Sequence, residues 1–307
     1  MNQGPQPAFS VNTSNGVFAF HIGTTVATWQ GVQLWLGFLP RMVDGQPWLH
    51  SLDLQRNLLP LAQTSPVVPS LNRVIVIDPG HGGENAGTRS VAGRNAYEKD
   101  YTLDWARRLS LLLEADGWAV FLTRTNDTDL ALSNRVNFAE QHRADLFISL
   151  HFNSAAPDET QYGLETYCLP PAGMPSTVTR GFDDETTVVF PNNSFDDQNL
   201  DLGFRAHRAL LEVNGHHDRG VRRARFLGVL RNQHRPAILV EGGYLSNPGE
   251  AHSIATTAFR QKLAQALASA IGPARPNLAQ AHEPPPTAPP PEHAPQNPSR
   301  SSLFDEP

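Results

Sequence analysis

Short apolar runs alternate with helical patterns from Arg73 to Ile271, and this alternation constrains the fold more than any other feature of the chain. Strands are predicted at "RVIVID", "WAVFLTR", "DLFISLH", "GLETYC" and "PAILVEGG". Helices are predicted at "KDYTLDWARRLSLLLEAD", at "LSNRVNFAEQHR" with Ser133 as its cap, and at "TTAFRQKLAQALASAI". Continuous apolar strands separated by helices indicate an α/β domain over residues 73–271, with a mainly parallel central sheet covered by helices on both faces.

The segments on either side of this domain have different patterns. Residues 1–15 are expected to be flexible. Residues 16–64 alternate apolar and polar positions in "GVFAFHI" and "GVQLWLGF" and end in the helical "LDLQRNLLPLA", which predicts a small β-rich module. Residues 65–72 read as a linker. Residues 272–307 are rich in proline and polar residues, so we expect a disordered tail.

Composition excludes several classes of function. The net charge of −6 favours neither nucleic acid nor an anionic membrane surface as a partner. Cys168 is the single cysteine, so a four-thiolate zinc site is excluded. No apolar run approaches the roughly 18 residues of a membrane span. The opening "MNQGPQPAFS" has neither the charged nor the apolar region of a signal peptide.

Two histidines follow the ends of predicted strands. His81 lies in "DPGHGG" just after the first strand, and His151 ends "DLFISLH". Ligands of open α/β sheets collect beyond the carboxyl ends of the strands, so we expect these imidazoles to converge. One such histidine would more simply be structural, but two at equivalent places favour a metal site. A phosphate-binding loop is the rival interpretation, and "DPGHGGENAG" lacks its Gly-Lys-Ser/Thr ending.

Two glutamates complete a candidate catalytic set. Glu98 stands at a helix start, where an acid can offset the helix dipole or serve as the anionic ligand beside two imidazoles. Glu241 ends the strand "PAILVEGG". An unpaired buried carboxylate is costly, and desolvation would raise its pKa, which suits a general base or acid.

The motifs "IDPGHGGENAG", "YEKDYTLDWARRLSLLLEADGWAVFLTRTNDTDLALSNRVNFAEQHRADLFISLHFNSA", "GVRRARFLGVLRN" and "PAILVEGGYLSNP" resemble those of the zinc-dependent N-acetylmuramoyl-L-alanine amidases of the Amidase_3 type. The resemblance implies that His81, Glu98 and His151 bind Zn²⁺ and that Glu241 acts on water and on the leaving amine. It implies peptidoglycan as substrate, cleavage between N-acetylmuramic acid and L-alanine, and a place in the cell envelope, in the periplasm. Wall remodelling or daughter-cell separation would be the role.

Two other functions remain open at this stage. Another zinc amide hydrolase on the same fold would keep the same ligands, because substrate choice depends on the walls of the cleft. A non-catalytic wall-binding module would be favoured by a missing ligand or a missing Glu241, and all four residues are present.

Several residues near the candidate site have open roles. Asn153 is expected to orient a ligand or substrate, or to cap a turn, and Asp78 to accept a hydrogen bond from a ligand imidazole or to cap the glycine turn. Arg124 either faces the cleft or forms a salt bridge. Two departures from the family's usual motifs are Glu84-Asn85 and the second glycine after Glu241, which suggests a flexible catalytic loop. The acidic segment 170–199 is a surface excursion or a border of the site.

Overall fold

The computed structural model describes residues 7–63, 72–215 and 217–273. The predicted linker 65–72 and the predicted tail 272–307 lie almost entirely outside these residues. Within the described ranges, no helix is both long enough and apolar enough to cross a membrane.

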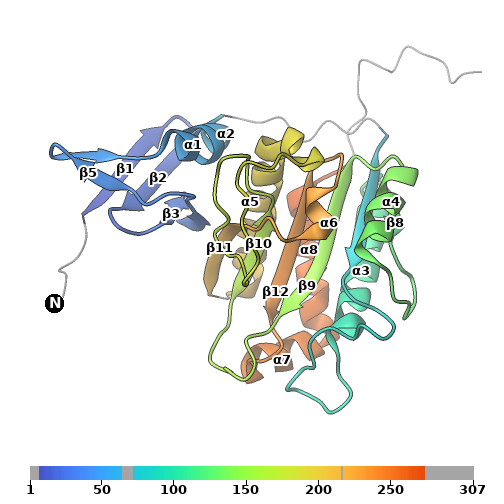
Figure 1. Ribbon diagram of the computed structural model, residues 1–307. Helices are drawn as coiled ribbons and strands as arrows, with labels where there is room; N and C mark the ends of the chain where they lie inside the picture. The colour runs from blue at the N-terminus through green and yellow to red at the C-terminus, as the bar shows by residue number, and fades with distance from the viewer. Residues whose placement is uncertain (1–6, 64–71, 216, 274–307) are drawn as a thin grey trace, which may run out of the picture. The chain divides into compact units, whose positions relative to one another are not determined.

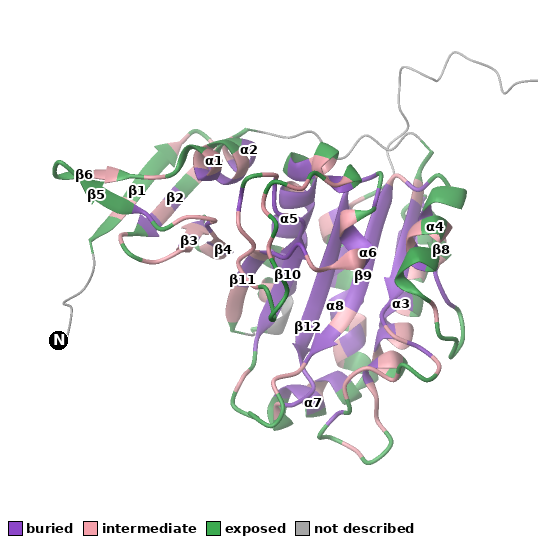
Figure 2. Ribbon diagram, in the orientation of Figure 1, coloured by how far each residue is buried: buried purple, intermediate pink, exposed green. Residues whose placement is uncertain are grey.

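A mainly parallel sheet forms the centre of the fold, as predicted. Its strands lie in the order β11-β10-β12-β9-β7-β8. Of these neighbours only β10 and β12 run antiparallel. The strands are β7 Val74–Pro79, β8 Ala119–Leu122, β9 Leu146–Asn153, β10 Leu164–Cys168, β11 Asp218–Arg223 and β12 Ala237–Tyr244. Figure 2 shows β12 buried along its whole length, and β9 is buried at every position except His151.

Helices cover both faces of this sheet because its strands are apolar on both sides. Ile75 and Ile77 pack in one core with Trp105, whereas Val76 packs in a second core with Ala139 on the opposite face. Figure 1 shows α8 behind the central strands and α6 in front. The helices are α3 Glu98–Ala115, α4 Leu132–Gln141, α5 Asp196–Asn214, α6 Gly228–Arg231, α7 Pro248–Ala255 and α8 Thr257–Ile271.

The N-terminal β-rich region extends this sheet. Strands β1 Ala8–Thr13, β2 Gly16–His21, β3 Val26–Trp29 and β4 Val32–Trp35 form an antiparallel meander. Strand β4 pairs in parallel with β11, so that one sheet contains ten strands. The hairpin β5 Arg41–Val43 and β6 Gln46–Trp48 and the helical segment 51–62 follow; that segment comprises α1 Ser51–Asp53, a π-helical stretch Leu54–Leu58 and α2 Leu59–Ala62.

Several expectations from the sequence are wrong. The stretch 1–15, expected to be flexible, contains β1, because six of its residues pair with β2 through backbone groups that composition does not reveal. Ser133 does not cap its helix, which begins one residue earlier with Ala131 at the N-cap. Strand β11 and helix α5 were not predicted, and the segment 170–199 runs into α5.

Candidate active site

The loop from β7 to α3 approaches the end of the sheet very closely, and its glycines make that approach possible. A Cβ on Gly80 would lie 2.3 Å from the His151 ring, and a Cβ on Gly87 would lie 2.6 Å from a Glu98 oxygen. His81 itself adopts a left-handed backbone conformation, with φ of 63°. The loop therefore carries His81 back over the ends of the strands.

His81, Glu98 and His151 come together at this edge of the sheet. Nε2 of His81 lies 3.0 Å from one oxygen of Glu98, and Nδ1 of His151 lies 3.0 Å from the other. The two imidazole rings are 4.9 Å apart between centroids and nearly perpendicular. The expected convergence of the strand-end histidines is thus present, and Glu98 joins them from the first turn of α3.

Neighbouring groups fix the orientation of these three side chains. Nδ1 of His81 donates to the side-chain oxygen of Asn85 at 2.9 Å, which leaves Nε2 facing Glu98. The backbone N–H groups of Thr88 and Phe152 each donate to Glu98 at 3.0 Å. Burial alone would raise the pKa of Glu98, but hydrogen bonds from His151 and His81 outweigh it and hold that pKa well below its usual value.

The donor set fits a zinc ion. One ligand atom from each of the three side chains lies within 4.8 Å of the others. Tetrahedral zinc holds nitrogen and oxygen ligands at about 2.0–2.1 Å, which separates neighbouring ligand atoms by about 3.3 Å. Two imidazoles and one carboxylate are a ligand set of catalytic zinc sites, in which a fourth position stays open.

Glu241 lies beside this cluster in the sheet. It pairs with His151 on β9 and with Glu165 on β10, so the three side chains form one row on the same face. Its Oε2 is buried without a hydrogen-bond partner among the described residues. Burial first, and then the charges of Glu98 and Glu165, raise the pKa of Glu241 well above its usual value, in the direction expected from the sequence.

One cavity of about 290 Å³ is lined by the three candidate ligands and by Glu241, but not by Glu165. Gly87 and Thr88 on the β7–α3 loop also line it. Its remaining lining residues are Phe152, Asn153, Ser154, Arg180, Leu227 and Leu239. Candidate metal ligands, a buried acid and open space therefore share one site.

The N-acetylmuramoyl-L-alanine amidase family matches residues 75–272, the part of the chain that builds this cavity. The chain belongs to this family of amidases.

Individual relatives agree with this assignment. The amidase AmiA of Salmonella typhimurium is 31% identical over an alignment of 221 residues, which covers 65% of this chain and 75% of AmiA. AmiC of Escherichia coli is 32% identical over 71% of this chain and 57% of its own length. The solved catalytic domain of CwlV, an amidase from Bacillus (Paenibacillus) polymyxa, is 31% identical, has a TM-score of 0.52, and matches 64% of this chain and 95% of that domain.

Asp78 of this amidase does not contact a ligand imidazole, so that expectation is wrong. Its carboxylate accepts hydrogen bonds from Arg135 at 2.6 Å, Thr123 at 2.6 Å and Ser149 at 2.8 Å. Arg135 in turn donates to the backbone carbonyl of His81 at 2.8 Å. Asp78 therefore supports the glycine turn indirectly, through a buried guanidinium.

Arg124 supports the same turn and does not face the amidase cavity. Its guanidinium donates to the carbonyls of Pro79 at 3.0 Å and Gly80 at 2.9 Å. The backbone that precedes His81 is thus held by two arginines, Arg124 and Arg135, from outside the loop.

Asn153 lines the cavity and also makes contacts within the protein. Its amide donates to Glu165 at 3.1 Å, and its side-chain oxygen accepts from the backbone N–H of Ser154 at 2.8 Å. Both expected roles, turn capping and contact with substrate, are compatible with this position. Contact with substrate stays a prediction.

Glu165 is a buried residue of the site that sequence reasoning missed. Besides Asn153, Arg219 at 2.6 Å, Tyr244 at 3.0 Å and Tyr167 contact its carboxylate. Its charge is one cause of the raised pKa of Glu241. The signal in the sequence was an acid inside the otherwise apolar strand "GLETYC".

The two glycines after Glu241 do not form the flexible loop expected from the sequence. They continue β12, and a Cβ on Gly242 would lie 2.9 Å from both Trp105 and Phe152. Close packing of aromatic rings therefore accounts for this glycine.

The acidic residues of segment 170–199 do not reach the candidate metal site. Asp184 forms an ion pair with Arg225 instead. The segment does border the site, because Arg180 lines the cavity.

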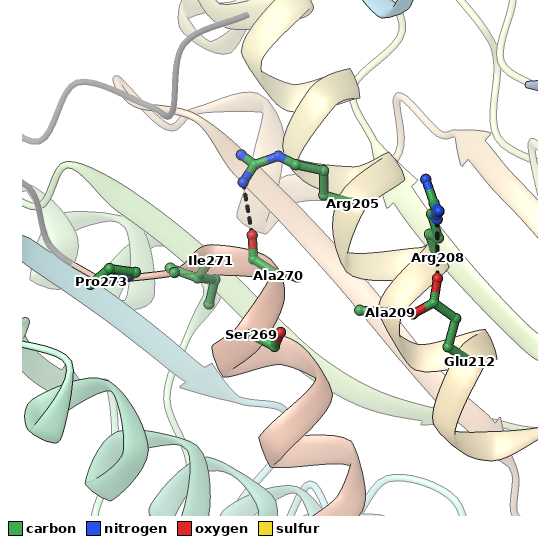
Figure 3. Close-up of a pocket in the computed structure, with 9 residues that line it drawn as sticks. Arg205, Arg208, Ala209, Glu212, Ser269, Ala270, Ile271 and Pro273 are labelled. Carbon is green, nitrogen blue, oxygen red and sulfur yellow. Dashed lines mark hydrogen bonds and ion pairs between the residues drawn. The ribbon is translucent and has the colours of Figure 1, made fainter. Parts of the chain in front are cut away.

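A second hollow, of about 460 Å³, lies between α5 and α8 and offers no comparable chemistry (Figure 3). Arg205 donates to the carbonyl of Ala270 at 2.8 Å, and Arg208 pairs with Glu212 at 3.1 Å. Since its charged groups contact each other or the backbone, this hollow has no set of ligands for a metal.

Proposed function

We propose that this amidase uses zinc to hydrolyse the bond between N-acetylmuramic acid and the L-alanine of the stem peptide in peptidoglycan. His81, Glu98 and His151 hold the zinc, and Glu241 is the general base and acid. The observation that carries this proposal is the shared cavity, in which two imidazoles, one carboxylate and a second, unbonded carboxylate oxygen face the same space.

Each residue has a distinct task in this proposal. Zinc, when bound, would polarise the scissile carbonyl and lower the pKa of a water molecule. Oε2 of Glu241, which has no hydrogen-bond partner among the described residues, accepts the proton of the attacking water. The same oxygen then donates that proton to the departing amine of L-alanine, so Glu241 returns to its starting state. Asn85 and the N–H groups of Thr88 and Phe152 keep the ligands in place.

The substrate also indicates a place for the protein. Peptidoglycan lies outside the cytoplasmic membrane, and one relative, LytH of Staphylococcus aureus, is named a probable cell wall amidase. We therefore place this enzyme in the cell envelope, in the periplasm, with wall remodelling or daughter-cell separation as its role.

Glu241→Gln tests this proposal, because it removes the proton acceptor and keeps the shape of the side chain. With zinc-loaded full-length protein and purified muropeptides, we expect hydrolysis to slow about 10²- to 10⁴-fold. Mass spectrometry should detect stem peptides with a free L-alanine amino terminus, and metal analysis should find one zinc bound per chain in both proteins.

Glu185→Gln is the matched control, since this glutamate is exposed and does not line the cavity. Its rate should equal that of the wild type. Full activity of Glu241→Gln, undiminished activity after zinc removal, or cleavage within the peptide or glycan would contradict the proposal.

A further inference from the structure

Arg180 brings a positive charge to the wall of the cavity. It is the one arginine or lysine among the described residues that line this space. Its charge also acts on Glu241, whose pKa it lowers, in opposition to burial and the neighbouring carboxylates. A cation on the wall of this cavity attracts anionic groups of a bound substrate.

The segment that carries Arg180 is fixed to the domain at several points. Asp184 accepts hydrogen bonds from the backbone N–H and the hydroxyl of Ser176, at 2.6 and 2.7 Å, and pairs with Arg225. Phe182 stacks on Phe226, with ring centroids 5.5 Å apart and an interplanar angle of 13°. These contacts hold the backbone on both sides of the turn that carries Arg180.

The guanidinium of Arg180 keeps its hydrogen-bonding capacity. It lies over the Phe226 ring, 5.6 Å from the centroid. Among the described residues, no acid lies within ion-pair distance of this guanidinium. Arg225, by contrast, forms an ion pair with Asp184. Its backbone and that of Gly181 are both left-handed, with φ of 49° and 80°, which makes a tight exposed turn. A preplaced arginine with free donors is suited to bidentate binding of a carboxylate.

We propose that Arg180 is a substrate-binding residue that selects stem peptides with a free α-carboxylate on the acidic residue after L-alanine. This inference rests on the proposed function of the same cavity. The amide that would be cleaved is flanked by a neutral sugar on one side and by the peptide on the other. Anionic groups near that amide therefore belong to the peptide, and the first of them follows L-alanine directly. In this proposal, the leaving peptide therefore lies against the side of the cavity that Arg180 lines.

Two muramyl peptides that differ at one group test this assignment. In one, the α-carboxylate of the second residue is free, and in the other it is a primary amide. With zinc-loaded full-length wild type, we expect a higher kcat/KM for the free acid. Arg180→Ala should lower kcat/KM for the free acid about 10- to 100-fold, mainly through KM, because a charged hydrogen-bonded contact to substrate is lost. The rate on the amide should change little.

Arg180→Lys should recover part of the preference, since lysine keeps the charge and loses the fork geometry. Arg94→Ala, at an exposed arginine outside the cavity, should behave as the wild type. An equal loss on both peptides, or no loss on either, would overturn the role of Arg180 while leaving the proposed function intact.

Failure of the wild type to cleave either peptide would instead contradict the proposed function. Calorimetry with the Glu241→Gln protein then decides the role of Arg180 separately. Tighter binding of the free acid that disappears in the Glu241→Gln, Arg180→Ala double variant supports carboxylate recognition, and equal binding of the two peptides refutes it.

Discussion

Four carboxylates are buried in and beside the cavity. They differ in how many hydrogen-bond partners they have, and this difference indicates different roles. Asp78, Glu98 and Glu165 are 1–3% exposed, and each accepts hydrogen bonds from several groups. Glu241 is 8% exposed, and one of its oxygens has no partner among the described residues. A satisfied buried carboxylate stabilises its surroundings, whereas an unsatisfied one is available for proton transfer.

Asp78 should make stability depend on pH. Burial alone would raise its pKa, but Arg135 and hydrogen bonds from Thr123 and Ser149 outweigh burial and hold the pKa below the ordinary 3.8. Because the folded pKa is the lower one, this stabilisation is complete above the ordinary value of 3.8, which applies to the unfolded chain, and it is lost as pH falls through the folded pKa. In urea denaturation at neutral pH, Asp78→Asn should lower the free energy of unfolding by about 3–5 kcal/mol.

The gap between wild type and Asp78→Asn should narrow as pH falls from about 5 toward 3. Asp183→Asn, at an exposed acid, should stay within about 0.5 kcal/mol of the wild type at neutral pH. If the difference in unfolding free energy between the wild type and Asp78→Asn stayed constant across this pH range, the ion pair between Asp78 and Arg135 would not be the cause of that difference.

The β7–α3 loop is the element on which the geometry of the site depends most. Arg124 and Arg135 hold its carbonyls from outside, and its glycines allow contact with His151 and Glu98. Glycine here provides room for neighbouring side chains, in addition to the turn that the sequence predicted.

Gly80→Ala should weaken metal binding with little effect on the rest of the fold. The added Cβ would lie 2.3 Å from the His151 ring, so the imidazole must shift from its position beside Glu98. Displacement of a ligand or of its support costs about 10- to 100-fold in metal affinity. Competition with a zinc chelator measures this loss, and circular dichroism monitors the fold.

Gly93→Ala provides the comparison in the same loop, because a Cβ there meets nothing closer than Ala96 at 3.4 Å. Zinc affinity should be unchanged in this variant. If Gly80→Ala bound zinc as tightly as Gly93→Ala does, close approach to His151 would not explain the glycine.

At the scale of the whole molecule, the N-terminal region and the amidase domain share one sheet and several buried contacts. Trp35 donates to the carbonyl of Arg219 at 2.9 Å. Arg223 is fully buried and donates to Leu169, Arg56 and Asn57 at 3.0–3.1 Å. The two regions should therefore unfold together.

Arg223→Ala should lower the free energy of unfolding by about 3 kcal/mol, because it leaves buried acceptors on both regions without their donor. Denaturation followed by tryptophan fluorescence and by circular dichroism should still give one common midpoint. Arg94→Ala should leave that midpoint unchanged. Two separate transitions in the wild type, or an unaffected Arg223→Ala protein, would mean that the regions are energetically independent.

The sequence by itself determined strands β7, β8, β9, β10 and β12, helices α3, α4 and α8, and the residues at the ends of those strands. It could do so because apolar runs, helical spacing and glycine turns are local properties. The same reasoning identified His81, Glu98, His151 and Glu241 as candidates that meet at one edge.

Only the tertiary structure decided which groups serve as partners. Strand β11 is rich in charge and becomes a strand by pairing with β4 and β10, while its Arg223 side chain is buried against distant segments. Glu165 and Arg180 acquire their contacts from residues distant in sequence, and Asp78 turned out to bind Arg135 rather than His81. Pairing, burial and charge neighbours depend on residues distant in sequence, so local pattern carries no record of them.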